Sequence, residues 1–170
     1  MQRVGEFEKV SLEQFRAAMK SDMFGYTDDE IAMIYESIKL PSRATSGSAG
    51  YDFKAPFGFV LKPGDCLKVP TGIRVKIDEG WWLGCLPRSS HGFKYQVHLA
   101  NTCGVIDSDY YGSDNEGHIF VKLVNFGSEA KTLAIQAGDS FMQAIFIPYG
   151  LTHSDNVNAS RNGGMGSTGA

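Results

Sequence analysis

The hydrophobic pattern of this chain changes near residue 39, and this change limits the possible folds more than any other feature. From there on, apolar residues alternate with polar ones, as where Ile73, Val75 and Ile77 enclose Arg74 and Lys76. A period of two is typical of a β-strand with one buried face. Such segments recur at a spacing of ~8–12 residues, between turns rich in Gly, Pro and Asp. The pattern predicts an all-β fold, a jelly-roll-like β-sandwich or barrel.

The first 38 residues have a helical pattern instead. Residues 11–14 and 27–30 both match a capping box, in which two side chains satisfy the free N–H groups at a helix start. Apolar residues follow each box at helical spacing, with a break at residues 24–25 and an end before Pro41. We therefore expect a helical N-terminal arm (1–38), packed on the body or on a neighbouring subunit, then a β domain (39–155) and a flexible Gly-rich tail (156–170).

Composition excludes several classes of function. The 170 residues suit one domain, and a net charge of −3 provides no basic field for nucleic acid or a membrane surface. The three cysteines, Cys66, Cys85 and Cys103, have no metal-binding spacing and are expected to be small buried hydrophobes. We expect no signal peptide and a reducing cytoplasm, which would be that of the host if the chain is viral.

Residues 104–112 combine features that suit the recognition of a flat ring. Gly104 and Gly112 enclose an apolar pair, two carboxylates and two tyrosines. We expect a tight hairpin in which the glycines supply positive φ angles. Such a hairpin can present backbone donors and acceptors to a ring, with a carboxylate beside it and an aromatic face over it. Taken alone, the segment also fits an ordinary turn.

The tail, residues 156–170, is poor in apolar residues and rich in glycine. Residues 164–169 match G-x-G-x-x-G, but a dinucleotide-binding fingerprint must open a helix after a strand, and a single residue follows here. The composition indicates either a disordered end or a flap that closes over a ligand, with Arg161 offering phosphate contacts.

Five short segments, in order, resemble the five motifs of the trimeric all-β dUTPases, which convert dUTP to dUMP and pyrophosphate. They are residues 49–52 (AGYD), 87–90 (PRSS), 104–112 (GVIDSDYYG), 138–143 (GDSFMQ) and 161–169 (RNGGMGSTG). The resemblance covers residues 39–170. It implies a dUTPase-like β-clip fold, a homotrimer with active sites shared between subunits, and Mg²⁺ held mainly by substrate oxygens, with Asp52 reaching it through water.

The resemblance also implies catalytic roles. Asp107 would be the general base that takes a proton from the attacking water, and Gln143 would orient that water. Arg88, Ser89 and Ser90 would contact the phosphates, whose negative charge requires cationic and hydroxyl donors.

The glycine-bracketed segment (residues 104–112) and the tail would bind the substrate. The expected base-binding residues are Asn101, Gly104, Val105 and Ile106. Tyr110 would lie flat on the deoxyribose and exclude a 2′-hydroxyl, while Tyr111 would point away and pack structurally. The expected tail residues are Arg161, Met165, Gly166, Ser167 and Thr168. Of these, Met165 stands where an aromatic residue often covers the uracil, and the others would close over the phosphates.

Two alternatives remain open from the residues. A dCTP deaminase on the same fold would carry a glutamate in the strand after the central hairpin, and residues 120–124 contain no carboxylate. A nucleotide-bound trimer could instead dock on a regulatory protein, through the helical arm or the acidic insertion at residues 113–117. Without such a partner, we expect the insertion to be a longer, solvated hairpin.

Overall fold

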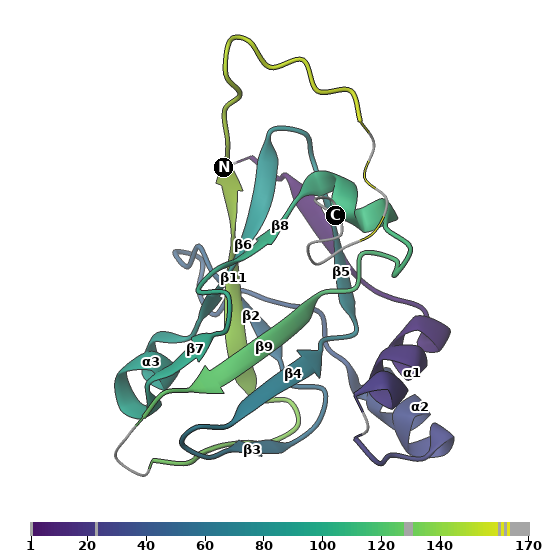
Figure 1. Ribbon diagram of the computed structural model, residues 1–170, viewed down its shortest axis with the longest axis vertical. Coiled ribbons are helices and arrows are strands. Elements are labelled where there is room, and N and C mark those ends of the chain that lie inside the picture. The colour runs from purple at the N-terminus through teal and green to yellow at the C-terminus, as the bar shows by residue number, and fades with distance from the viewer. Residues whose placement is uncertain (1, 23, 128–130, 160, 162, 164–170) are drawn as a thin grey trace.

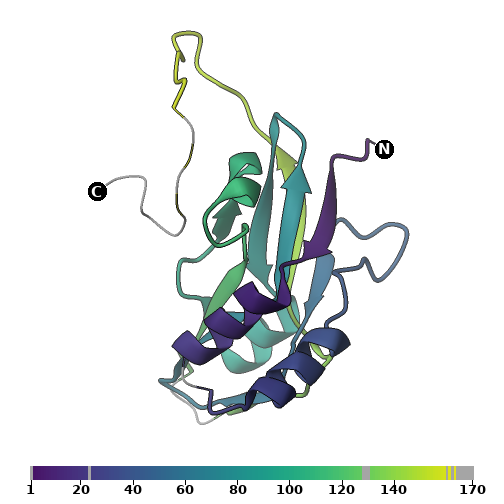
Figure 2. The same cartoon turned by 90° about the vertical axis from the view of Figure 1, so that its right-hand side faces the viewer.

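The structure is a computed structural model that describes residues 2–22, 24–127, 131–159, 161 and 163. It consists of antiparallel strands with two helices packed side by side at one end (Figures 1 and 2). The strands are β1 (Gly5–Lys9), β2 (Tyr51–Lys54), β3 (Phe59–Leu61), β4 (Cys66–Pro70), β5 (Ile73–Ile77), β6 (Trp81–Pro87), β7 (Val97–Leu99), β8 (Gly104–Ile106), β9 (Phe120–Asn125), β10 (Leu133–Ile135) and β11 (Ser140–Pro148). The helices are α1 (Leu12–Ser21), α2 (Asp28–Ser37), α3 (Ser89–Tyr95) and the 3-10 helix η1 (Ser108–Gly112).

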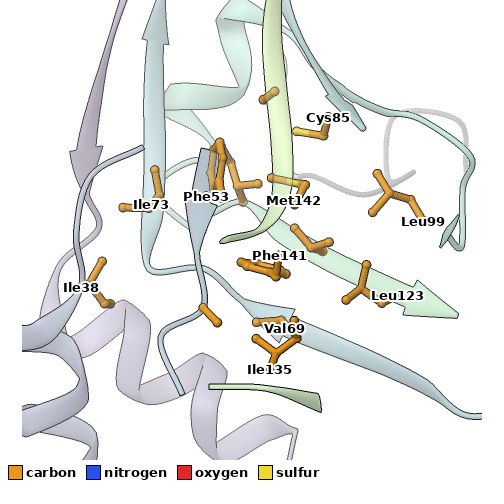
Figure 3. Close-up of a cluster of buried hydrophobic side chains, with 14 of the residues drawn as sticks. Ile38, Phe53, Val69, Ile73, Cys85, Leu99, Leu123, Ile135, Phe141 and Met142 are labelled. Atoms are coloured by element: carbon orange, nitrogen blue, oxygen red, sulfur yellow. The ribbon is translucent and has the colours of Figure 1, made fainter. Parts of the chain in front are cut away.

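The described strands form sheets in the orders β2-β11-β6-β8, β4-β9-β7, β1-β5 and β3-β10. Phe53, Phe141 and Met142 lie in the hydrophobic cluster between these sheets, with Leu123 from β9 beside them (Figure 3). The alternating segment behaves as its pattern predicts, because Ile73, Val75 and Ile77 of β5 are buried. The predicted all-β, jelly-roll-like class is confirmed.

The predicted helical pair forms and belongs to the same core. Phe15 and Met19 of α1 and Ile31 of α2 are each at most 1% exposed. The capping box at Thr27 and Glu30 is complete, with both reciprocal hydrogen bonds present. Ser11 caps α1 by accepting from the Gln14 N–H, but its own N–H donates to Glu116, 105 residues along the chain.

Three local features differ from the sequence-based expectations. Residues 5–9 form β1, which pairs with β5, so the two helices are inserted between strands of the body. Helix α3 was not predicted, because SSHGFKY has no apolar period. Cys66 is exposed rather than buried, since it opens β4 at a turn, whereas Cys85 is buried within β6 as expected.

Candidate active site

The glycine-bracketed segment is a strand followed by a 3-10 helix, so the predicted hairpin is wrong. β8 pairs with β6 and not with β9, and Asp107 is the N-cap of η1. Neither Gly104 nor Gly112 has a positive φ. Gly104 instead lies close to the neighbouring strand, because a Cβ there would lie 3.0 Å from the Cβ of Cys85.

A pocket of about 570 Å³ opens beside β8. Asn101, Tyr110 and all three residues of β8 (Gly104, Val105, Ile106) line it, as the sequence-based hypothesis for the base site required. Its walls are mainly apolar, from residues such as Leu99, Val121 and Met142. Tyr110 is 5% exposed, and this burial raises its phenol pKa, opposed by a hydrogen bond that the phenol receives from Asn115. An apolar pocket with convergent polar groups suits a flat heterocycle. We refer to it below as the base pocket.

A second pocket, of about 320 Å³, gathers the three predicted phosphate-binding residues of the PRSS segment, Arg88, Ser89 and Ser90. Its polar lining includes Asp52, Arg88, Ser89, Ser90 and Gln143. Arg88 Nε lies 3.4 Å from Asp52 Oδ1, and Arg88 also donates to the carbonyl of Ser140. One cation beside two hydroxyls and an amide is a donor set that suits anionic oxygens. We refer to it as the phosphate pocket.

The two pockets open on opposite faces of the sheet β2-β11-β6-β8. Met142 lines the base pocket and Gln143, the next residue of β11, lines the phosphate pocket. Consecutive side chains of a strand point to opposite faces, so the two pockets are separated by the sheet itself. Asp107 is not among the described residues that line either pocket, whereas Arg88 and Gln143 both line the phosphate pocket, so these two pockets do not bring the three residues together.

Asp107, the predicted general base, is engaged by the tail. Arg161 donates from one guanidinium nitrogen to Asp107 and from Nε to Asp109 Oδ1, at 2.9 Å for the latter. The guanidinium carbon also lies 5.8 Å from the centroid of the Tyr110 ring. The described trace after β11 runs out from the sheet and turns back toward η1 (Figure 1). In this arrangement Arg161 occupies one of the two carboxylate oxygens of Asp107.

Magnesium fits the donor set of the phosphate pocket. Within the described ranges, no group of three or more His, Cys, Asp or Glu residues could hold a metal ion. Asp52 does present a carboxylate oxygen in this pocket, and carboxylate oxygens are hard ligands of the kind Mg²⁺ takes, usually together with waters and substrate phosphates. The predicted tail contacts Met165, Gly166, Ser167 and Thr168 lie outside the described residues.

The insertion after Gly112 is not the solvated hairpin that we expected. Ser113, Gly117 and His118 are buried, and Asn115 donates to the Tyr110 hydroxyl at 2.8 Å. The sequence-based interpretation missed Asn115, because nothing in its sequence neighbourhood indicates a contact with the tyrosine. Tyr111, by contrast, points away from the base pocket and donates to Glu8 of β1.

An antiparallel β body with one pocket for a flat ring and another for anions is typical of an all-β nucleotide-binding protein. A family model described as dUTPase matches residues 36–169. The deoxyuridine 5'-triphosphate nucleotidohydrolase of Lactococcus lactis subsp. lactis is 39% identical over 136 residues, covering 78% of this chain and 89% of that protein. The enzyme of the same name from Escherichia phage T5 is 35% identical over 144 residues, covering 77% and 92%. The chain therefore belongs to the dUTPase family, and the predicted resemblance is confirmed.

Solved structures agree with this assignment. The crystal structure of dUTPase from Streptococcus mutans matches with a TM-score of 0.63 and 32% identity, covering 87% of this chain and 98% of that one. A dUTPase from phage phi11 of S. aureus, whose structure reports the coordination of a structural Mg(II) ion, shares the fold with a TM-score of 0.57 and 22% identity, covering 73% and 92%. In the described part of the chain, no helix has the length and apolarity needed to cross a membrane.

Proposed function

We propose that this chain hydrolyses dUTP to dUMP and pyrophosphate, which limits uracil in DNA and supplies dUMP for dTTP synthesis. One observation carries the proposal. A chain of the dUTPase family has a base pocket lined by Asn101, β8 and Tyr110, and it gathers Arg88, Ser89, Ser90 and Gln143 in a separate phosphate pocket. The bacterial and phage sources of the relatives favour action in the cytoplasm of a bacterium or of a phage host.

Recognition of the base would come from the edge of β8. The backbone groups of Gly104, Val105 and Ile106 can pair with the uracil edge, and the Asn101 amide offers both a donor and an acceptor. A base whose edge pairs with the β8 backbone would leave little room there for the 5-methyl group of thymine. The Tyr110 ring would lie on the deoxyribose and leave a 2′-hydroxyl neither space nor a partner.

The reaction would be an in-line displacement at the α-phosphorus. Asp107 takes a proton from water, the water oxygen forms a bond to the α-phosphorus, and the bond from that phosphorus to the bridging oxygen breaks, releasing pyrophosphate. Gln143 orients the water, while Arg88, Ser89 and Ser90 hold the phosphate oxygens on which charge develops. When bound, Mg²⁺ would neutralise negative charge on the phosphates.

A complete site would require more than one subunit. Because the base and phosphate pockets lie on opposite faces of one sheet, a nucleotide in the base pocket of one copy would meet the phosphate pocket of another. This geometry favours sites shared between copies, and membership of the dUTPase family supports a homotrimer. Residues 156–170 would serve as the flap of the 39–155 domain. Arg161 would leave Asp107 and bind substrate phosphate instead. Met165 would cover the base, and the phosphates would be contacted by Gly166, Ser167 and Thr168.

Docking on a regulatory protein is the weaker candidate. The acidic insertion that would serve it packs against Tyr110 and α1, so most of its polar groups already have partners inside the chain. No described contact favours an external protein at this position.

The proposal is tested by pyrophosphate release from dUTP, dTTP, UTP and dCTP, with and without Mg²⁺. We expect hydrolysis of dUTP with Mg²⁺ and little turnover of the others. Asp107→Asn should bind dUTP but lose about 10²–10⁴-fold in kcat. Asp109→Asn is the matched control, since Asp109 is the other carboxylate that Arg161 contacts, and this variant should keep its turnover. Equal turnover of dUTP and UTP, or an active Asp107→Asn variant, would overturn the proposal.

The flap is tested separately by truncation after Ala159. The shortened chain should melt near the same temperature, because the described core residues all lie within residues 7–146. Its turnover of dUTP should be strongly reduced. Normal turnover would show that the flap assignment is wrong.

A further inference from the structure

The insertion (residues 113–117) and His118 together form a loop, residues 113–118, that hydrogen-bonds the phenol of Tyr110. The Tyr110 hydroxyl donates to the carbonyl of His118 at 2.8 Å and accepts from the side-chain amide of Asn115, also at 2.8 Å. The other end of the Asn115 amide accepts from the N–H of Gly117 at 3.2 Å. One side chain thus connects the backbone of the loop to the oxygen of the tyrosine.

The backbone of the loop is held in an unusual conformation. Gly117 has a φ of 68°, and a Cβ at this position would lie 2.8 Å from the carbonyl oxygen of Tyr110 and 2.8 Å from the Cα of Tyr111. Glu116 has a φ of 59°, in the left-handed region that residues with a side chain rarely adopt. Such a conformation persists only where surrounding contacts hold it in place, and it points to a role for the loop.

The contacts that hold Glu116 come from the helical arm. One Glu116 carboxylate oxygen accepts from the Ser11 N–H at 2.7 Å, and the other accepts from the Ser11 hydroxyl at 2.6 Å. Ser11 is also the N-cap of α1, so the carboxylate satisfies a free donor at the start of that helix. The bonds join α1 to the loop, and the loop joins α1 to Tyr110.

We propose that Asn115 is a positioning residue that fixes the Tyr110 ring against the deoxyribose, and that the Ser11–Glu116 contact holds Asn115 in place. The inference rests on the proposed function, in which Tyr110 excludes a 2′-hydroxyl. A phenol held at both its donor and its acceptor side keeps its ring rigid at the wall of the base pocket. A ring released from the loop has room to tilt, and the site then admits ribose.

The decisive measurement is the ratio of kcat/KM for dUTP to kcat/KM for UTP. Asn115→Ala should lower this ratio roughly fivefold, the effect of one lost hydrogen bond, mainly through a gain in turnover of UTP. Tyr110→Phe keeps the ring and removes the hydroxyl, so it should lower the ratio at least as much. The double variant should match Tyr110→Phe alone, because Asn115 then has no phenol to hold. Independent, additive effects of the two substitutions would overturn the proposal.

The link to the arm has a matched control. Glu116→Gln and Glu30→Gln each remove a carboxylate that accepts hydrogen bonds at a helix start, but Glu30 caps α2 and does not contact the loop. Glu116→Gln should lower the dUTP-to-UTP ratio by roughly two- to fivefold, and Glu30→Gln should leave it unchanged. If both variants change the ratio equally, the effect reflects general loosening of the arm, and the proposed link is wrong.

Failure of this inference can be told from failure of the proposed function. Tyr110→Ala removes the ring itself and should abolish most discrimination between dUTP and UTP. If it does so while Asn115→Ala leaves the ratio at the parental value, the positioning role is wrong and the sugar contact stands. If Tyr110→Ala also leaves the ratio unchanged, the assignment of Tyr110 to the deoxyribose is wrong. Affinities of dUMP and UMP, measured by calorimetry, should follow the same order without turnover.

Discussion

His118 should lower the free energy of unfolding of this protein in mild acid, because the residues around it disfavour the protonated side chain. The side chain is fully buried between the rings of Phe15 and Phe120. Its Nε2 accepts from the Gly72 N–H at 2.9 Å, so it cannot gain a proton there without losing that bond. Its Nδ1 has no hydrogen-bond partner among the described residues. Burial lowers the pKa of His118 from 6.5 to about 3; Glu116 raises it by a smaller amount, and Lys68 lowers it further.

The sign and size of the effect follow from proton linkage. The folded state keeps His118 neutral above its pKa of about 3, whereas the unfolded chain takes up a proton near 6.5. The contribution of neutral His118 to the free energy of unfolding is therefore fully present at neutral pH. It is lost progressively as the pH drops below 6.5 toward 3. Each unit costs about 1.4 kcal/mol, so a drop from about pH 7.5 to about pH 5 removes about 2 kcal/mol.

The assay is urea unfolding at several pH values and one fixed chain concentration, for the parent and for His118→Gln. The glutamine does not titrate, and its side-chain oxygen can still accept from Gly72. His91 also has a pKa lowered by burial, but it is present in both proteins, so its contribution cancels in the comparison. The free energy of unfolding of the parent should fall by about 2 kcal/mol more than that of the variant over this range. Parallel curves would refute the argument.

Three further predictions concern Gly104, two of the cysteines, and Asn125. Gly104→Ala should weaken substrate binding, measured as a rise in KM for dUTP, because the new Cβ meets the Cβ of Cys85 and displaces β8; an unchanged KM would count against this role. Cys66 is exposed and should react with iodoacetamide in the native protein. Cys85 is buried, which raises its pKa to about 12, and it should react only after unfolding. Peptide mass mapping of the two cysteines distinguishes these outcomes. Asn125→Ala should lower the free energy of unfolding, measured by urea titration, by about 2–4 kcal/mol. The reason is that the buried amide of Asn125 makes hydrogen bonds with the backbone of Leu61, Lys131 and Gly127. A loss under about 1 kcal/mol, on the order of one exposed hydrogen bond, would contradict this prediction.

Features with a local physical cause could be predicted from the sequence. The period-two pattern of residues 73–77 follows from one buried face of β5, and the structure has that face. The capping box at Thr27 and Glu30 involves residues three apart, so its hydrogen bonds depend on nothing else in the chain. The candidate site residues could be found for a related reason: short motifs identify residue types and spacing without the need for tertiary structure.

Features that depend on distant partners could not be predicted in this way. The Ser11 N–H could have bonded the Gln14 side chain, but Glu116 provides a charged acceptor that is far away in sequence. The polar residues of the insertion predict a solvated hairpin. In the fold, however, Asn115 hydrogen-bonds to Tyr110 and Glu116 hydrogen-bonds to Ser11. Polarity predicts exposure only where no folded partner compensates for burial.

The separation of the candidate site into two pockets also depends on tertiary structure and could not be predicted from the motifs. The motifs that contain Asp107 and Gln143 can be recognised separately, and their order along the chain says nothing about which face of a sheet each occupies. Met142 and Gln143 are neighbours in sequence, but alternation along β11 places one in the base pocket and the other in the phosphate pocket. Under the proposed function, a substrate that spans both kinds of pocket would therefore meet surfaces from different copies of the chain. Activity that depends on chain concentration, lost on dilution below the dissociation constant of the copies, is the expected consequence.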